Sequence, residues 1–264
     1  MLCNAIKDLS NIDESKYIYE IKKDGTRVWL YCLNNKIVRA ENRRGTDILY
    51  KYPELKCLKI SLKAGVLDGE LCCKDFSTLL SREHLKDSFK IRLSSKKNPI
   101  TFYAFDILDY NGKILGNLPL MERKKYLEKL VVSECETFRV LPYLTNLKGI
   151  LNIMKETEAE GIILKEKDSV YVNGRSNSWL KFKKRVEEVI KFDGYEENTD
   201  NSLTLTNGTY KKEKSVIRVK CNELNAKTLI DKYKFVNVIV EGLEITKSGK
   251  IRMPIVKEVL NADN

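Results

Sequence analysis

Short runs of alternating apolar and polar residues fill most of the first forty positions, and they limit the possible folds more than any other feature of the chain. The runs at residues 17–20, 27–33 and 36–40 have the period of half-buried strands. Asp24-Gly25 and Asn34-Asn35 separate the runs, and both dipeptides favour tight turns. This region is therefore predicted to be antiparallel sheet.

Helical spacing appears later in the chain. Apolar residues fall on one helical face over residues 118–130, where Pro119 is in the first turn, a position that helices tolerate. A second helix is predicted over 147–158, and Gly161 then opens an apolar strand at 162–165. Strands and helices are mixed without a regular βαβ alternation, so the predicted class is α+β.

The composition changes after about Arg185. Residues 193–208 are rich in Asn, Asp, Thr and Gly, which indicates turns. Strands are predicted beyond them at 215–220, 235–243 and 251–259, with a helix near 225–232. Short strands with one helix are compatible with a small β-barrel such as an OB-fold. We therefore expect two domains, at residues 1–185 and 186–264.

The net positive charge of the chain favours polyanionic partners but does not establish them. The 264 residues include 48 Lys and Arg against 37 Asp and Glu, a net charge of +11. Such an excess favours nucleic-acid binding, but solvated lysine-rich faces would give the same count.

Cysteine and histidine usage excludes several kinds of site. The seven cysteines contain no C-x-x-C pair, and His84 is the single histidine, so we expect reduced thiols and neither a structural zinc site nor a Ser-His-Asp triad. The sequence has no signal-peptide pattern and no apolar run of about 20 residues. We therefore expect that the protein does not enter membranes. We expect it in the cytoplasm, or in the nucleoid or nucleus if the nucleic acid is held there.

Lys22 is the first candidate for chemistry, because the Asp24-Gly25 turn would hold it at a strand end. A neutral lysine amine near pH 7.5 costs about 4 kcal/mol unless burial or neighbouring cations lower its pKa. Taken alone, a lysine before such a turn is as readily explained as a solvated strand residue.

The segment Lys22-Lys23-Asp24-Gly25-Thr26-Arg27 resembles motif I, K-x-D-G-x-R, of the covalent nucleotidyltransferases. This superfamily contains ATP-dependent DNA ligases, RNA ligases and mRNA-capping guanylyltransferases. Further segments resemble the later motifs in the same order: Asn42-Arg43-Arg44-Gly45, Leu67-Asp68-Gly69-Glu70-Leu71, Phe105-Asp106-Ile107-Leu108, Glu160-Gly161-Ile162-Ile163-Leu164-Lys165 and Trp179-Leu180-Lys181-Phe182-Lys183. Each string is common in strands and turns, and the resemblance rests on their joint order and spacing.

The intervening segments are similar to those of ATP-dependent DNA ligases in particular. FDILDYNGKILGNLPLMERKKYLEKLV and VYVNGRSNSWLKFK carry this similarity, which covers most of residues 1–185. It implies a small ligase, without an N-terminal DNA-binding domain, that seals nicks in duplex DNA in replication, repair or recombination. ATP and Mg²⁺ (or Mn²⁺) are the implied cofactors, nicked duplex DNA the partner and a monomer the expected state.

The resemblance also assigns roles to individual residues. Lys22 is the implied nucleophile and forms lysyl-AMP. The implied ATP or AMP contacts are Glu20, Lys22, Arg27, Glu70, Phe105, Lys181 and Lys183. Arg43 is the implied contact of the nick 5′-phosphate, and Glu160 with Glu70 would direct the metal. Lys181 and Lys183 alternate along one predicted strand, so both would face the same side. A solvated strand face would give the same pattern.

The C-terminal segment follows the ligase pattern more loosely. Arg252, Pro254 and Lys257 match the frame of motif VI, but Glu258 and Leu260 stand where arginines are expected. This departure implies slow self-adenylation, or substitution by Arg252 and Lys257. Two alternatives stay open: an RNA ligase or capping guanylyltransferase, and a non-catalytic homologue that binds nicks.

Overall fold

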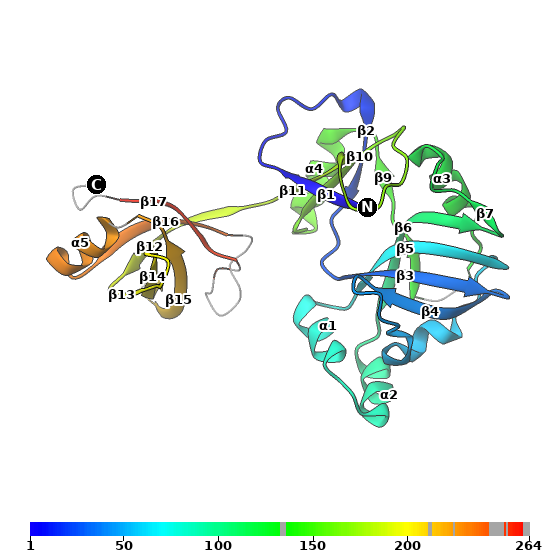
Figure 1. The fold of residues 1–264 in the computed structure, drawn as a ribbon, viewed down its shortest axis with the longest axis horizontal. Helices are drawn as coiled ribbons and strands as arrows, with labels where there is room; N and C mark the ends of the chain where they lie inside the picture. The colour runs from blue at the N-terminus through cyan, green and yellow to red at the C-terminus, as the bar shows by residue number, and fades with distance from the viewer. Residues whose placement is uncertain (133–135, 211–212, 224, 243–250, 252, 261–264) are drawn as a thin grey trace. The chain divides into compact units, whose positions relative to one another are not determined.

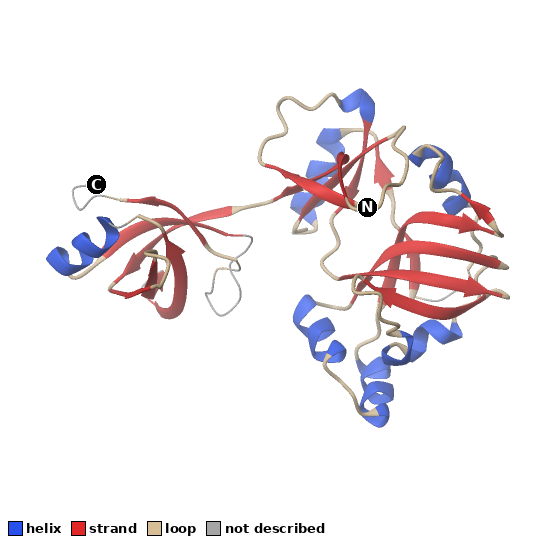
Figure 2. Cartoon of the chain, viewed as in Figure 1, coloured by secondary structure: helices blue, strands red, loops and turns tan. Residues whose placement is uncertain are grey.

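The computed structural model describes residues 1–132, 136–210, 213–223, 225–242, 251 and 253–260, with only the backbone of residues 210 and 213–217. The chain divides into two compact units, Met1–Phe182 and Lys183–Asn264 (Figure 1). Strands form the body of both units and helices lie at the margins of the sheets (Figure 2). The predicted α+β class is confirmed.

One sheet of the first unit has five strands. In spatial order they are β1 (Leu2–Ile6), β11 (Arg175–Lys183), β10 (Gly161–Glu166), β2 (Tyr17–Ile21) and β9 (Tyr143–Leu144). The first pair is parallel, whereas β10 and β2 are antiparallel, with Ile162 opposite Ile21. Helix α4 (Leu147–Glu156) covers this sheet, because Ile150 and Met154 pack against Tyr19 and Leu164 in one core cluster.

The other sheet of this unit has six strands. They are β4 (Lys36–Asn42), β3 (Thr26–Leu33), β5 (Ala64–Cys72), β6 (Thr101–Tyr110), β7 (Lys113–Ile114) and, beside β6, β8 (Phe138–Val140). Its helices are α1 (Phe76–Glu83), α2 (Ser88–Lys97) and α3 (Leu120–Glu128), with short 3-10 helices η2 (Leu49–Lys51) and η3 (Pro53–Cys57); a further 3-10 helix, η1 (Glu14–Lys16), directly precedes β2 of the five-stranded sheet. Leu30, Leu67 and Phe102 belong to the large core cluster of this part.

The two turns that the sequence predicts near the N-terminus have different outcomes. Asn34 and Asn35 have φ of 50° and 61°, and they join β3 and β4 as a hairpin, as predicted. The prediction of a hairpin at Asp24-Gly25 is wrong, because β2 pairs with β9 and β10 whereas β3 pairs with β4 and β5. The chain crosses from one sheet to the other between β2 and β3.

The predicted helices are confirmed with shorter bounds. The helix expected over 118–130 is α3, which starts after Pro119 at its N-cap. The helix expected over 147–158 is α4, where the Asn146 side chain accepts a hydrogen bond from the Gly149 amide at 2.8 Å. It ends before Glu158, which has φ of 50°.

The described residues of the second unit form one antiparallel six-stranded sheet and one helix. Its elements are β12 (Val186–Phe192), β13 (Gly194–Glu197), β14 (Leu203–Tyr210), β15 (Glu213–Cys221), α5 (Asn225–Tyr233), β16 (Val236–Gly242) and β17 (Ile255–Val259). Among the described strands no pairing closes this sheet into a barrel, so the two-domain OB-fold assignment stays a proposal.

The turn-rich stretch 193–208 also contains strands. Leu203 and Leu205 are buried at alternate positions of β14, so two apolar side chains are enough to anchor a strand in a polar segment. Among the described helices of both units, none is long and apolar enough to cross a membrane.

Candidate active site

Lys22 lies directly after β2, where the chain leaves the five-stranded sheet. Its backbone N–H donates a hydrogen bond to the Gly161 carbonyl oxygen at 2.9 Å, continuing the pairing of β2 with β10. Its ammonium forms an ion pair with the Glu160 carboxylate. The Lys22 side chain is 21% exposed and that of Glu160 is 8% exposed. The pairing of two strands thus brings together the predicted nucleophile and the predicted metal-directing carboxylate.

Gly25 fixes the crossing between the sheets. A Cβ atom at this position would overlap the Leu71 carbonyl oxygen and lie 2.9 Å from Glu70 Cγ. No side chain fits in such a space, so the crossing segment can press against β5 only with glycine here. Glu70 is thereby held beside the segment that carries Lys22.

The pKa of the Glu70 carboxyl is set by burial and by two nearby cations, Lys22 and Arg27. Burial raises the pKa of the Glu70 carboxyl to about 8, and the charges of Lys22 and Arg27 oppose this rise. Gly69 precedes it, and a Cβ there would overlap the ring of Phe102. The glycines of both Asp-Gly pairs, Asp24-Gly25 and Asp68-Gly69, are therefore required by close packing.

Arg27 is held by a buried carboxylate. Its Nε donates to Asp68 Oδ1 at 2.9 Å and its Nη2 to Asp68 Oδ2 at 2.5 Å. The Tyr171 hydroxyl donates to Asp68 Oδ2 at 2.8 Å. The Asp68 charge raises the pKa of Arg27 despite burial, so the guanidinium is permanently charged.

Phe105 lies in a cluster of rings and cations. Its ring centroid is 6.2 Å from that of Trp179, at 76°, and Arg27 lies 5.3 Å from it. Lys165 Nζ lies 4.3 Å from the Phe105 centroid and 4.0 Å from that of Trp179. Phe105 is only partly buried, which suits the face of a base-stacking residue.

Glu20 is enclosed rather than open to solvent. Its carboxylate is 2% exposed and forms ion pairs with Lys124 and, at 2.7 Å, with Lys165. Burial lowers the pKa of Lys165, and the Glu20 charge opposes that change. The structure thus places the Glu20 side chain within a buried Lys-Glu-Lys triad.

Sequence reasoning missed this triad and its neighbour, the buried ion pair of Arg123 with Asp106. Arg123 donates to both Asp106 oxygens at 2.8 Å. The signal was present, because Arg123 and Lys124 fall between Leu120 and Leu127 at i+3 and i+4, on the apolar face of α3. Cations at core positions of an amphipathic helix indicate buried carboxylate partners.

Lys181 and Lys183, the predicted phosphate-binding lysines, fall at the end of β11. Lys181 is opposite Ala5 of β1. Burial raises the pKa of the Cys3 thiol, whereas the charges of Lys165, Arg27 and Lys181 lower it, which places these cations around Cys3. Lys183 alternates with Lys181 along β11 but is the first residue of the second unit.

Arg43 and Arg27 line one pocket of about 240 Å³, together with Trp29, Asn42 and Asn173. Arg43 is exposed in the loop after β4. Gly45, with φ of 78°, lets this loop turn, and Asn42 Oδ1 accepts from the Thr46 amide at 3.1 Å. Arg43, predicted to contact the nick 5′-phosphate, and Arg27, predicted to contact the nucleotide, thus share one concave surface.

The motif VI residues divide between described and undescribed parts of the chain. Arg252 lies outside the described residues. Lys257, on β17, forms an ion pair with Glu187 at 2.6 Å within the second unit. Glu258 is exposed, and Leu260 donates its backbone N–H to the Asn237 carbonyl oxygen at 2.9 Å.

Comparison with known proteins adds a family. The model of the ATP-dependent DNA ligase domain matches residues 1–183. The SPbeta prophage-derived DNA ligase-like protein LigB of Bacillus subtilis is 29% identical over 264 residues, covering 96% of both chains. The bifunctional non-homologous end joining protein LigD of the same species is 27% identical over 70% of this chain. The match spans 34% of LigD, so this chain corresponds to about a third of it.

Solved structures share the fold. A Lig E DNA ligase, described as binding DNA with a minimal scaffold, superposes with a TM-score of 0.66 at 18% identity, covering 98% of this chain and all of that one. A mycobacterial DNA ligase D complexed with ATP and MES gives a TM-score of 0.54 at 19% identity over 99% and 95% of the two chains.

Proposed function

Because its first 183 residues match that domain model, the chain belongs to the ATP-dependent DNA ligase family, and we propose that it seals nicks in duplex DNA through AMP carried on Lys22. The observation that carries the proposal is the position of Lys22, whose ammonium pairs with Glu160, directly before β10, and whose charge acts on the carboxyl of Glu70 in β5 of the other sheet. The family and the site together favour a monomer that acts wherever the DNA is held, in the cytoplasm, nucleoid or nucleus.

Three in-line displacements at phosphorus make up the proposed reaction. First, Lys22 Nζ bonds to the α-phosphorus of ATP, losing a proton, as the bond to pyrophosphate breaks. Second, an oxygen of the nick 5′-phosphate bonds to the AMP phosphorus and Lys22 leaves. Third, the 3′-hydroxyl bonds to the 5′-phosphorus, and AMP leaves as the hydroxyl proton departs.

The surrounding residues supply positioning and charge. Phe105 would stack on adenine, and Glu70 would accept a hydrogen bond from the ribose. Glu20 would support the base pocket from within its ion triad. Arg43 and Arg27 would hold the 5′-phosphate in their shared pocket. Lys181 and Lys183 would neutralise the phosphate oxygens in transit.

The carboxylates fit a magnesium ion that is shared with the nucleotide. Within the described residues no group of three or more Asp, Glu, His or Cys side chains gathers to hold a metal. Magnesium commonly uses one or two protein carboxylates together with substrate phosphates and water. Glu160 and Glu70 would hold it, and the ion would supply charge neutralisation at the phosphates.

Labelling with ATP tests the nucleophile. We expect the protein, given α-labelled ATP and a magnesium salt, to retain amine-linked label through denaturation, because the label is bonded covalently to the chain. The Lys22→Ala variant is expected to retain none. Label on that variant would refute the assignment of Lys22, and an unlabelled wild type would instead indicate a non-catalytic nick-binding homologue.

Arg43→Ala is the matched comparison, because Arg43 is exposed and lies outside the ion pairs around Lys22. This variant should form lysyl-AMP normally but transfer it slowly to a nicked duplex. Single-turnover assays that start from adenylated protein measure the second step alone. Sealing at the wild-type rate would remove Arg43 from the 5′-phosphate site.

A further inference from the structure

Helix α2 carries a concentration of positive charge that the proposed reaction does not use. Its ten residues include Lys90, Arg92, Lys96 and Lys97 and no acidic residue. All four cations are exposed, and Ile91 is the one buried side chain of the helix. Lys96 and Lys97 fall in the last turn, where cations suit the helix dipole, whereas Lys90 and Arg92 lie nearer the start of the helix.

The ion pairs of the first unit can be compared with the charges of α2. Some exposed cations of the first unit have carboxylate partners, as in the ion pairs of Lys16 with Asp13 and of Lys125 with Glu122, whereas others, such as Lys148 and Lys155, are in none of the ion pairs between described residues. In the described parts of the chain no ion pair includes a cation of α2. Their charge therefore projects into solvent and is available to an anionic partner.

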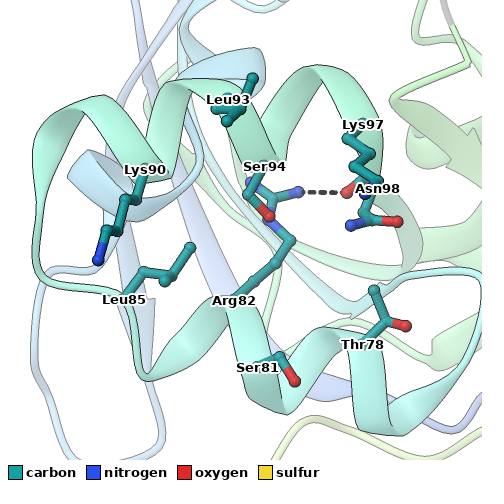
Figure 3. A pocket seen from close by; sticks show the side chains of 9 residues that line it. All are labelled: Thr78, Ser81, Arg82, Leu85, Lys90, Leu93, Ser94, Lys97 and Asn98. Carbon is teal, nitrogen blue, oxygen red and sulfur yellow. Dashed lines mark hydrogen bonds between the residues drawn. The ribbon is translucent and has the colours of Figure 1, made fainter.

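A pocket of about 350 Å³ lies between α1 and α2. Figure 3 shows Lys90 and Lys97 near its two ends, with the hydroxyls of Ser81 and Thr78 on the facing helix. Arg82 braces the pair from inside: it is buried, it binds both oxygens of Glu54, and its Nη1 donates to the Asn98 carbonyl oxygen at 2.9 Å. The cations are thus displayed on a braced helix pair.

The helix pair is joined to the segment that carries the proposed nucleophile. Glu83, the last residue of α1, accepts a hydrogen bond from the Thr26 hydroxyl through its carboxylate and one from the Lys51 ammonium through its backbone carbonyl. Thr26 is four residues beyond Lys22 and begins β3. Figure 1 shows α1 and α2 together on one side of the sheet that contains β3.

We propose that the α1–α2 pocket and the exposed cations of α2 bind the phosphate backbone of the DNA duplex at a distance from the nick. This inference rests on the proposed function, which supplies the DNA. Lysines with nearby hydroxyls are the usual contacts of DNA phosphates, and they position a protein without reading sequence. A surface of one charge sign fits a polyanion, whereas an ordinary protein partner would offer mixed charges.

Binding of a nicked duplex as a function of salt tests the proposal. The variant carries Lys90→Ala and Lys97→Ala, and its matched control carries Lys148→Ala and Lys155→Ala. The control lysines are also exposed but lie on α4, which packs on the other sheet. For each phosphate that the variant no longer binds, the slope of log affinity against log salt should fall by about 0.9, and binding should weaken up to about eightfold at 0.1 M salt.

The expected result is a weaker, less salt-sensitive Kd for the α2 variant, with the control unchanged. Lysyl-AMP formation, which needs no DNA, should stay at the wild-type level in both and shows that the fold is intact. Replacement of both lysines by arginine should restore binding. Equal Kd and slope in the α2 variant and the wild type would overturn the proposal. A protein that binds DNA through α2 but forms no lysyl-AMP would refute the proposed function and leave this inference standing.

Discussion

The Glu70 carboxyl binds its proton more tightly than an ordinary glutamate, with a pKa of about 8 against 4.5. The folded protein therefore holds a proton that the unfolded chain has released between these two pH values. The contribution of this proton to the free energy of unfolding is complete below pH 4.5 and is lost as the pH rises to about 8. Above that pH a partly buried carboxylate must be accommodated beside Lys22 and Arg27.

Glu70→Gln should therefore gain stability relative to the wild type as the pH rises. We expect the difference in free energy of unfolding between the two proteins to change in favour of glutamine from pH 4.5 to 8, and to be constant above. Urea unfolding at several pH values measures it. A difference that is independent of pH would show that Glu70 has an ordinary pKa.

Glu20 should matter more to stability than either lysine that it binds. Glu20→Gln would leave two buried ammonium groups without a counter-ion, for a loss of about 3–5 kcal/mol. Lys165→Met would instead leave the ion pair of Glu20 and Lys124, which has no net charge. We therefore expect a smaller loss in the free energy of unfolding. Chemical denaturation of both variants at pH 7 compares them, and an equal or greater loss in Lys165→Met would contradict the triad.

At the scale of elements, sequence periodicity predicted the helices α3 and α4 and the strands of the first forty residues well. It could not tell that β2 and β3 belong to different sheets, because an Asp-Gly pair serves a hairpin and a crossing equally. What decides between them is the contact of Gly25 with Leu71 of β5, a residue distant in the chain. The motif order predicted the site residues that the structure brings near Lys22, namely Glu160 and Glu70. The helical pattern of α3 could have indicated that Arg123 and Lys124 are buried, but only the fold shows that Asp106 and Glu20 are their partners.

Gly25→Ala tests the role of the crossing segment. The added methyl group would meet the Leu71 carbonyl oxygen, which is backbone and cannot rotate away. We expect a loss of about 1–3 kcal/mol and impaired lysyl-AMP formation. Gly116→Ala is the control, because its Cβ would meet nothing closer than 3.9 Å. Thermal melting and labelling of both variants provide the measurements, and a fully active Gly25→Ala would show that the segment tolerates a side chain.

At the scale of the whole molecule, the hydrophobic clusters of the described residues each lie within one unit. The cluster that contains Ile190, Leu205 and Val238 belongs to the second unit, and the other clusters belong to the first. Each unit therefore has a core of its own, which is the physical requirement for separate unfolding.

Leu205→Ala should destabilise the second unit alone. Leu205 is fully buried, and truncation of such a leucine costs about 2–5 kcal/mol. We expect the variant to lower the midpoint temperature of the calorimetric transition of the second unit. ATP should raise the midpoint temperature of the other transition, because the proposed nucleotide contacts lie mostly in the first unit. A single transition that responds to both changes would show that the units unfold together.

The crossing between β2 and β3 has a mechanical consequence. Lys22 is fastened to the five-stranded sheet through Gly161, whereas Glu70 is part of the six-stranded sheet. The distance from the proposed nucleophile Lys22 to the Glu70 carboxylate therefore depends on how the two sheets pack against each other. A cavity made between the sheets by removal of a buried methyl group would let the sheets shift relative to each other. Lys22 and Glu70 would then be misaligned even though every motif residue is unchanged.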